Sequence, residues 1–149
     1  FLYHAHGYEF RPYDGEGTMY DYMMANTDPR YVNVEMDVFW MRNPGQDPAA
    51  LMRKYPNRIA VTHLKDRMIG SVDNLDGRQD KQRNVVLGTG DVNIAEVMKA
   101  AKEIAATNVK EIVLTGVNTG DYGLINNKRV YTFFELIIFC FPFFLVAFI

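Results

Sequence analysis

The sequence has little cysteine and little histidine: one cysteine and three histidines among 149 residues. A lone cysteine, Cys140, cannot form a disulfide within the chain, so we expect a reducing, cytoplasmic compartment. No excess charge of either sign is present, because 16 Lys and Arg residues stand against 18 Asp and Glu residues, a net charge of -2. This balance gives no electrostatic reason to expect nucleic acid as a partner.

Two further features are missing at the start of the chain. No signal-peptide pattern opens it, and Phe1 begins inside a predicted strand without an initiator methionine. We therefore expect a truncated chain. The composition is otherwise that of a globular domain, with 48% hydrophobic and 23% charged residues. A chain of this length can bury one hydrophobic core.

The last residues, 136–149, carry no charge and are rich in phenylalanine. Extending this segment back to Val130 gives a stretch of membrane-spanning length that includes Glu135, since a span needs about 20 apolar residues. Pro142 in the middle argues against a membrane helix. We expect a buried or aggregation-prone apolar tail, and membrane association only through residues 130–149.

Strand and helix patterns alternate along the chain. Strands are predicted over Phe1–His4, Tyr31–Asp37, Arg58–Leu64 and Glu111–Thr115, with helices over 18–25, 48–55 and 94–106 and a long polar loop over 65–91. This order is typical of an α/β fold with a parallel sheet and right-handed crossovers. Four strands are about half of a (β/α)8 TIM barrel of roughly 250 residues, and a small open sheet is the alternative.

Polar residues that bind metals stand where three predicted strands end. His4 ends the first strand and His6 follows it, Asp37 ends the second, and His63 lies near the end of the third. The carboxyl ends of parallel strands meet at one edge of the sheet, where α/β proteins gather their chemistry. Imidazole and carboxylate together suit a divalent transition metal. The alternative is that the histidines make only strand-end hydrogen bonds.

Neighbouring residues suggest further roles at the same edge. Glu9 and Glu35 are candidate bases, and strand alternation places Glu35 on the face of Asp37. Trp40 suits either stacking on a sugar ring or core packing, and Lys65 suits either an ion pair with Asp66 or an anionic or polyol substrate. The glycine-containing segments 88–93 and 116–123 match neither a dinucleotide-binding motif nor a P-loop.

Four segments together carry a resemblance to a known family: Tyr3-His4-Ala5-His6-Gly7-Tyr8-Glu9-Phe10, Val34-Glu35-Met36-Asp37-Val38-Phe39-Trp40, His63-Leu64-Lys65-Asp66 and Leu87-Gly88-Thr89-Gly90-Asp91-Val92. In order and spacing, residues 1 to about 103 resemble the second half of the sugar phosphate isomerases/epimerases, which have a xylose-isomerase-like TIM barrel. The resemblance implies a sugar or sugar phosphate substrate and a divalent metal such as Mn, Co, Mg or Zn. It also implies proton transfer by carboxylates beside a ketose carbonyl.

The same resemblance assigns roles to individual residues. Asp37 and His63 match the family's metal-binding Asp and His, and Glu9 is the carboxylate expected to act in catalysis. His4, His6, Trp40 and Lys65 are expected to line the substrate pocket. His4, His6 and Glu9 lie on the strand that elsewhere in the family presents a Glu ligand.

Two departures from the family pattern predict impaired activity. The first four barrel strands are missing, and Thr115 stands about where a metal-binding, catalytic Glu should end the last strand. Residues of about 101–136 instead resemble a segment of the radical-SAM tRNA methylthiotransferases, without the cluster cysteines, which Cys140 cannot replace.

We therefore expect a composite chain of three parts: a half barrel over 1–103, a strand and Gly-rich loop over 104–128, and an apolar tail over 129–149. The predicted function is that of an impaired fragment of a metal-dependent sugar isomerase/epimerase. The alternatives are a non-catalytic or membrane-associated fragment, or a methylthiotransferase fragment without its cluster. Open sheet edges in a half barrel also predict homo-oligomers.

Overall fold

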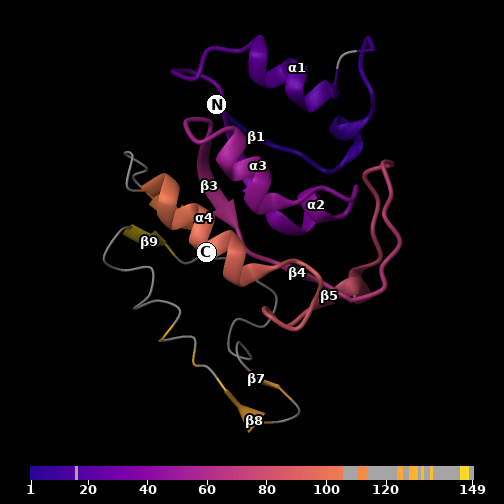
Figure 1. Cartoon of the computed structure of the whole chain (residues 1–149), viewed down its shortest axis with the longest axis vertical. Helices are drawn as coiled ribbons and strands as arrows, with labels where there is room; N and C mark the ends of the chain where they lie inside the picture. The colour runs from indigo at the N-terminus through magenta and orange to yellow at the C-terminus, as the bar shows by residue number, and fades with distance from the viewer. Residues whose placement is uncertain are drawn as a thin grey trace.

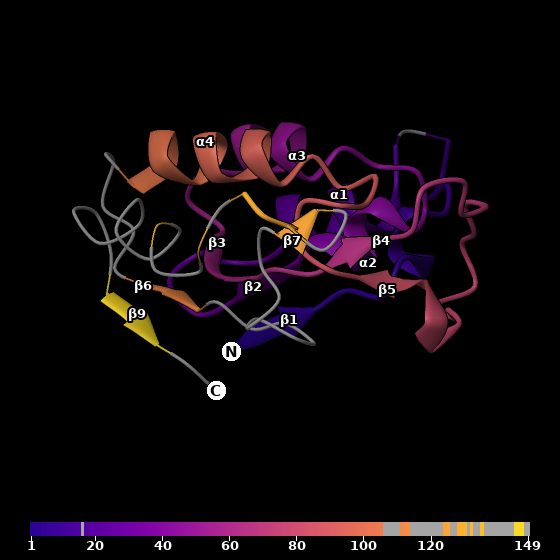
Figure 2. The same cartoon turned by 90° about the horizontal axis from the view of Figure 1, so that it is seen from below.

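Three parallel strands form the centre of the fold. The computed structural model describes residues 1–15, 17–105, 111–113, 124–125, 128–130, 132, 135 and 145–147. Figure 1 shows the whole chain. Strands β1 (Leu2–His4), β2 (Asn33–Asp37) and β3 (Ile59–His63) lie in the order β1-β2-β3 (Figure 2). His4 pairs with Glu35 and Asp37 pairs with His63, so the carboxyl ends of the three strands lie together.

Among residues 1–105, apart from the undescribed position 16, the structure has four α-helices: α1 (Met19–Ala25), α2 (Val38–Arg42), α3 (Pro48–Lys54) and α4 (Ile94–Ala105). The predicted helices at 18–25, 48–55 and 94–106 are confirmed, and each begins at a polar cap. Thr18 and Asp21 form a capping box on α1, the Asp47 carboxylate accepts from the backbone N–H groups of Ala49 and Ala50, and Asn93 accepts from the N–H of Glu96.

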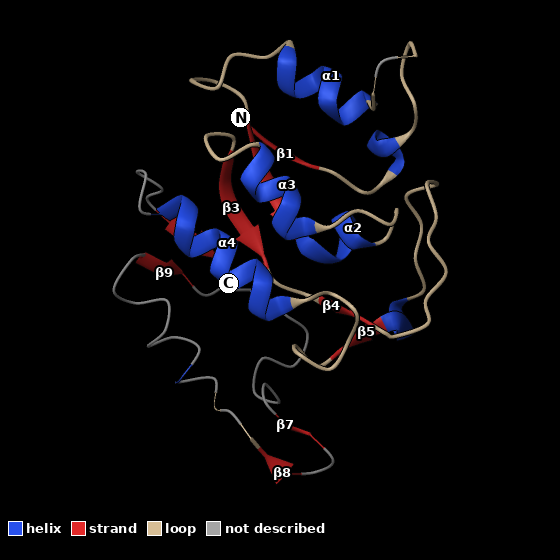
Figure 3. Cartoon of the chain, viewed as in Figure 1, coloured by secondary structure: helices blue, strands red, loops and turns tan. Residues whose placement is uncertain are grey.

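The core contains residues from the sheet and from all four described α-helices, including Tyr20 and Met24 of α1 and Val38 and Met41 of α2. Figure 2 shows α3 and α4 side by side over one face of the three strands. Figure 3 colours the helices and strands by secondary structure. Val34 and Met36 of β2 are fully buried, whereas Asn33 and Glu35, which alternate with them, are partly exposed. From the helices, Leu51, Met52, Val97, Met98, Ala101 and Ile104 belong to the same buried cluster.

The helix α2 was not predicted. It starts directly after β2, and Asp37 is both the last residue of the strand and the N-cap of the helix. The Oδ1 atom of Asp37 accepts hydrogen bonds from the backbone N–H groups of Phe39 (3.1 Å) and Trp40 (3.4 Å). A helix of five residues is too short to show an apolar period, so its signal was the cap alone.

The segment 65–91 was predicted to be a loop without secondary structure, and this prediction is wrong in part. It contains a short antiparallel pair of strands, β4 (Asp66–Arg67) and β5 (Asn84–Val85), and the 3-10 helix η2 (Lys81–Arg83). A second 3-10 helix, η1, covers Tyr8–Phe10. Buried polar groups organise the 65–91 segment in place of an apolar core.

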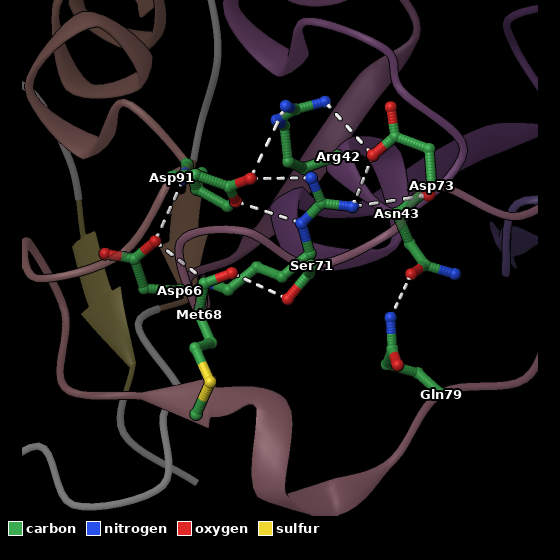
Figure 4. A network of polar contacts seen from close by, with 10 residues as sticks. Arg42, Asn43, Asp66, Met68, Ser71, Asp73, Gln79 and Asp91 are labelled. Carbon is green, nitrogen blue, oxygen red and sulfur yellow. Dashed lines mark hydrogen bonds and ion pairs between the residues drawn. The ribbon is translucent and has the colours of Figure 1, made fainter.

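Arg67 is the centre of this polar network, and Figure 4 labels its partners Asp91, Asp73 and Asn43. Its side chain is fully buried and forms ion pairs with Asp91 (2.6 Å) and Asp73 (2.7 Å), and it donates to the carbonyl oxygen of Asn43 (3.4 Å). Arg42 adds longer ion pairs to the same two aspartates. The network therefore ties the end of α2 to both ends of the 67–91 segment.

The buried Asp66 carboxylate fixes the chain before α4. It accepts hydrogen bonds from the backbone N–H groups of Gly88 (2.8 Å), Gly90 (2.8 Å) and Val92 (3.0 Å), as well as from Arg67. The expected ion pair between Lys65 and Asp66 is wrong, because Lys65 pairs with Asp37 instead. Main-chain donors therefore hold the Asp66 carboxylate in place.

The remaining described strands lie after α4. β6 (Glu111–Val113) lies close to β3 and pairs in parallel with β9 (Leu145–Ala147), and β7 (Leu124–Ile125) pairs with β8 (Lys128–Arg129). Part of the expected apolar tail is therefore a strand. Within the described residues, no helix has the length and apolar character needed to span a membrane.

The predicted division of the chain falls mainly on residues outside the described ranges. The helix α4 runs without a break through position 103, where the first boundary was placed. Thr115, Cys140 and the Gly-rich segment 116–123 lie outside the described residues. The division into 1–103, 104–128 and 129–149 therefore stays a prediction.

Candidate metal centre at the ends of three strands

The last residue of each central strand contributes to one cluster. His4 ends β1, Asp37 ends β2 and His63 ends β3. The Oδ2 atom of Asp37 lies 3.5 Å from Nε2 of His4 and 3.2 Å from Nδ1 of His63. All three ligand atoms lie within 4.8 Å of one another. The three residues come together because parallel strands with this register end at the same edge.

The Asp37 carboxylate presents its two oxygens to different partners. Oδ1 caps α2, whereas Oδ2 faces His4, His63 and the Nζ atom of Lys65, which lies 2.8 Å away. The side chain of Asp37 is fully buried. The cap thus fixes the carboxylate plane and turns one oxygen toward the cluster.

The electrostatics of the cluster favour an ionised carboxylate beside a neutral imidazole. Burial alone would raise the pKa of Asp37, but the interaction with His4 and the charge of Lys65 lower it below its usual value. Burial lowers the pKa of His63, and the contact with Asp37 raises the pKa of His4. A neutral His63 offers the lone pair that a metal requires.

The residues fit a divalent cation on two observations. The buried Nδ1 atom of His63 has no hydrogen-bond partner, although it lies 3.2 Å from Asp37. The two distances from Asp37 to the imidazole nitrogens also match the roughly 3.3 Å that separates ligands around a tetrahedral ion with bonds of about 2.0 Å. Two imidazoles and a carboxylate are a common ligand set for Zn²⁺ and related ions.

Glu35 stands at the rim of the cluster. Its Oε1 atom lies 3.8 Å from Nδ1 of His63, and its side chain is partly exposed. The expectation that strand alternation places Glu35 and Asp37 on one face is confirmed, since both carboxylates approach the same nitrogen. The family resemblance assigned no role to Glu35, whereas in the structure its carboxylate lies beside the proposed metal ligand His63.

Glu9 lies outside this cluster and is buried in the turn that follows β1. Its carboxylate accepts hydrogen bonds from the hydroxyl of Tyr3 (2.8 Å) and from the backbone N–H groups of His6 (3.0 Å) and Gly7 (2.8 Å). Burial and the hydrogen bond to Glu9 raise the pKa of Tyr3. Tyr3 also packs partly against the core, and its contact with Glu9 was not predicted, since no spacing rule links a strand residue to a 3-10 helix.

His6, Trp40 and His4 form a chain of rings beside the cluster. The ring centroids of His6 and Trp40 lie 4.9 Å apart in an edge-to-face arrangement, and those of His4 and His6 lie 4.6 Å apart. Trp40 also packs partly against the core. The structure thus brings His4, His6, Trp40 and Lys65 to the same edge of the sheet, as predicted for the substrate pocket, while their contact with a substrate stays a prediction.

Comparisons with known proteins bear on the fold. No protein-family model matches this chain, and no curated protein sequence matches it significantly. Two solved structures of sugar phosphate isomerases/epimerases from Parabacteroides distasonis ATCC 8503 match with a TM-score of 0.56, at 26% and 27% identity. They cover 94% and 95% of this chain. The chain spans 43% and 45% of their lengths, less than half of each.

A third structure, an IOLI protein with a bound zinc atom, matches at a TM-score of 0.45 and 18% identity, a likeness too weak to carry an argument. The resemblance of residues 101–136 to methylthiotransferases is not supported, since the two better matches extend over nearly the whole chain. The chain has a mixed α/β fold that matches part of a TIM barrel, and its structural neighbours are sugar phosphate isomerases/epimerases.

Proposed function

We propose that this chain carries the metal-binding edge of a sugar or sugar phosphate isomerase/epimerase. The observation that carries the proposal is the convergence of His4, Asp37 and His63 at the ends of three adjacent strands. The structural neighbours support the reaction class at the level of the family. Activity of this chain itself, which spans less than half of those neighbours, is part of the proposal.

In the proposed site His4, Asp37 and His63 hold the cation. A divalent metal there would supply a Lewis acid for the carbonyl oxygen of a sugar. Its identity is proposed from the donor set alone, which suits Zn²⁺, Mn²⁺ or Co²⁺ better than Mg²⁺. The buried Nδ1 atom of His63 has no hydrogen-bond partner, and a bound cation would give it one.

We assign proton transfer to Glu35 before Glu9. Glu35 is partly exposed and lies beside the cluster, whereas Glu9 already accepts three hydrogen bonds in a buried turn. A base needs a free lone pair within reach of the proton that it removes. Glu9 then acts as a positioning residue, since its bonds to the turn hold His6 against Trp40.

Calorimetric titration of the full chain with Mn²⁺, Co²⁺ and Zn²⁺ tests the metal centre. His4→Ala and His63→Ala should each weaken binding by about 100-fold or more, because one of three protein ligands is lost. His6→Ala is the matched control, a histidine beside the cluster that is not a ligand, and it should bind within a few-fold of the wild type. Equal loss in all three variants would refute the assigned ligand set.

Solvent exchange tests the reaction class separately. A panel of ketoses and ketose phosphates is incubated with the metal-loaded chain in D2O, and deuterium at the carbon next to the carbonyl is followed by NMR. We expect exchange that falls by about 100-fold in Glu35→Gln. A larger loss in Glu9→Gln would restore Glu9 as the base. Metal binding without any exchange would leave a metal-binding module and refute the enzymatic proposal.

A further inference from the structure

We infer that Lys65 is an internal counter-cation of Asp37 and that a divalent metal must displace it. This inference rests on the metal centre proposed above. The Nζ atom of Lys65 lies 2.8 Å from Oδ2 of Asp37, the same oxygen that faces His4 and His63. The ammonium group and the proposed cation therefore depend on one atom.

Asp37 has no second oxygen to offer. Its Oδ1 atom accepts from the backbone N–H groups of Phe39 and Trp40, and the side chain is fully buried. Rotation of the carboxylate would break the cap of α2. Oδ2 thus serves either the ammonium group or the metal at close range, and a fixed ammonium group beside a divalent ion would repel it.

Lys65 can leave while its backbone stays in place. It stands between His63, the last residue of β3, and Asp66, whose buried carboxylate is fixed by four main-chain N–H groups. The Lys65 side chain is partly exposed, at 23%. A flexible four-carbon stem can carry its charge into water without moving the strand.

In the metal-free protein, the ion pair between Lys65 and Asp37 takes the place of the metal. With Lys65 in place, the buried Asp37 charge is compensated, and the sheet edge does not hold an unpaired carboxylate. With a metal in place, the cation provides that compensation. The affinity for metal is then lowered by the pairing that stabilises the metal-free state, since the two cations compete for Asp37.

The substitution Lys65→Met separates these contributions, because it keeps the stem and removes the charge. We expect Lys65→Met to bind Co²⁺ or Zn²⁺ at least about tenfold more tightly than the wild type. Its metal-free form should melt at a lower temperature, and the rise in melting temperature on adding metal should be larger. Lys65→Arg, which keeps the charge, and Lys99→Met, which removes an exposed charge on α4, are the controls.

Calorimetry and the visible spectrum of bound Co²⁺ give the readout, with melting curves for each variant. Tighter binding in Lys65→Met, and in neither control, supports the inference. Unchanged or weaker binding in a folded Lys65→Met overturns it and leaves the metal centre standing. Absence of binding in every folded variant, the wild type included, overturns the metal centre and the inference with it. Lys65→Gln replaces Lys65→Met if the latter does not fold.

Discussion

Gly90 lies so close to Asp66 that a Cβ atom at position 90 would overlap both the Asp66 carboxylate and the carbonyl oxygen of Arg67. This close approach allows the N–H groups of Gly88, Gly90 and Val92 to converge on one carboxylate. The glycine is therefore required by space and not by a left-handed backbone.

Gly90→Ala should lower the free energy of unfolding by about 3 kcal/mol. The added methyl group would overlap the Asp66 carboxylate and break its hydrogen bonds to the backbone N–H groups. Gly70→Ala is the control. Gly70 has a φ of 81° and nothing near its Cβ position, so only backbone strain of about 1 kcal/mol is expected there. Urea denaturation of both variants measures the difference, and equal losses would contradict the steric account.

Arg67→Met should cost about 3 kcal/mol of stability. The substitution removes the short ion pairs to Asp91 and Asp73, which keep only the longer pairs with Arg42. It also removes one of the two donors to the Asn43 carbonyl oxygen, and the N–H of Asn74 remains. Arg30→Met offers the comparison, since the Arg30–Asp28 pair is exposed and should contribute little. Chemical denaturation gives both values. A loss for Arg67→Met as small as that for Arg30→Met would mean that the network does not hold the 67–91 segment.

Asp37→Asn and Asp37→Ala should differ even without metal. Asparagine keeps an oxygen that can accept from Phe39 and Trp40, whereas alanine removes the cap of α2. The metal-free Asp37→Ala protein should therefore be less stable than Asp37→Asn by about 1 kcal/mol. Both should lose metal binding. Equal stability of the two metal-free variants would show that the cap contributes nothing.

Asp21 should make the fold sensitive to acid. Burial opposes its ionisation, but hydrogen bonds from Lys54, Tyr55 and Thr18 hold the pKa of Asp21 well below its usual value. A lowered pKa in the folded state means that the stabilisation is complete above the unfolded value of about 4. It is then lost as the pH falls through the folded pKa.

Asp21→Asn should be less stable than the wild type by about 1 kcal/mol at pH 7, where the capping box and the Lys54 ion pair are both weakened. The difference should begin to shrink below about pH 4, where the unfolded wild type takes up a proton, and it should vanish only once the pH has fallen below the lowered folded-state pKa of Asp21. Urea unfolding at pH 7 and pH 3 tests this. A difference that does not change with pH would exclude the Asp21 charge as its source.

Sequence patterns predicted those parts of the fold that follow local rules. Asp47 and Asn93, both typical N-cap residues, predicted where two helices start. Apolar spacing predicted the helix at 18–25 and the buried face of α4. The meeting of His4, Asp37 and His63 followed from the rule that parallel strands end at one edge. In each case the information lies within a few residues of the chain.

The features that were missed depend on contacts between distant residues. Lys65 looked like a partner for its neighbour Asp66, yet it reaches Asp37 in another strand, and Asp66 binds main-chain groups more than 20 positions later. Contacts between residues so far apart in the sequence cannot be read from the spacing of neighbouring residues. The helix α2 was missed because Asp37 gave a signal for a strand end and for a cap at once.

The three proposed ligands belong to three strands, and β1, at one edge of this sheet, has only three residues. A cation held by all three would act as a clip across the sheet and would couple the opening of β1 to that of β2 and β3. Amide hydrogens of Tyr3 and His4, expected to exchange quickly in a short edge strand, would then be protected together with those of the centre. The exchange rates of these amides would therefore report whether a metal is bound, independently of any turnover of sugar.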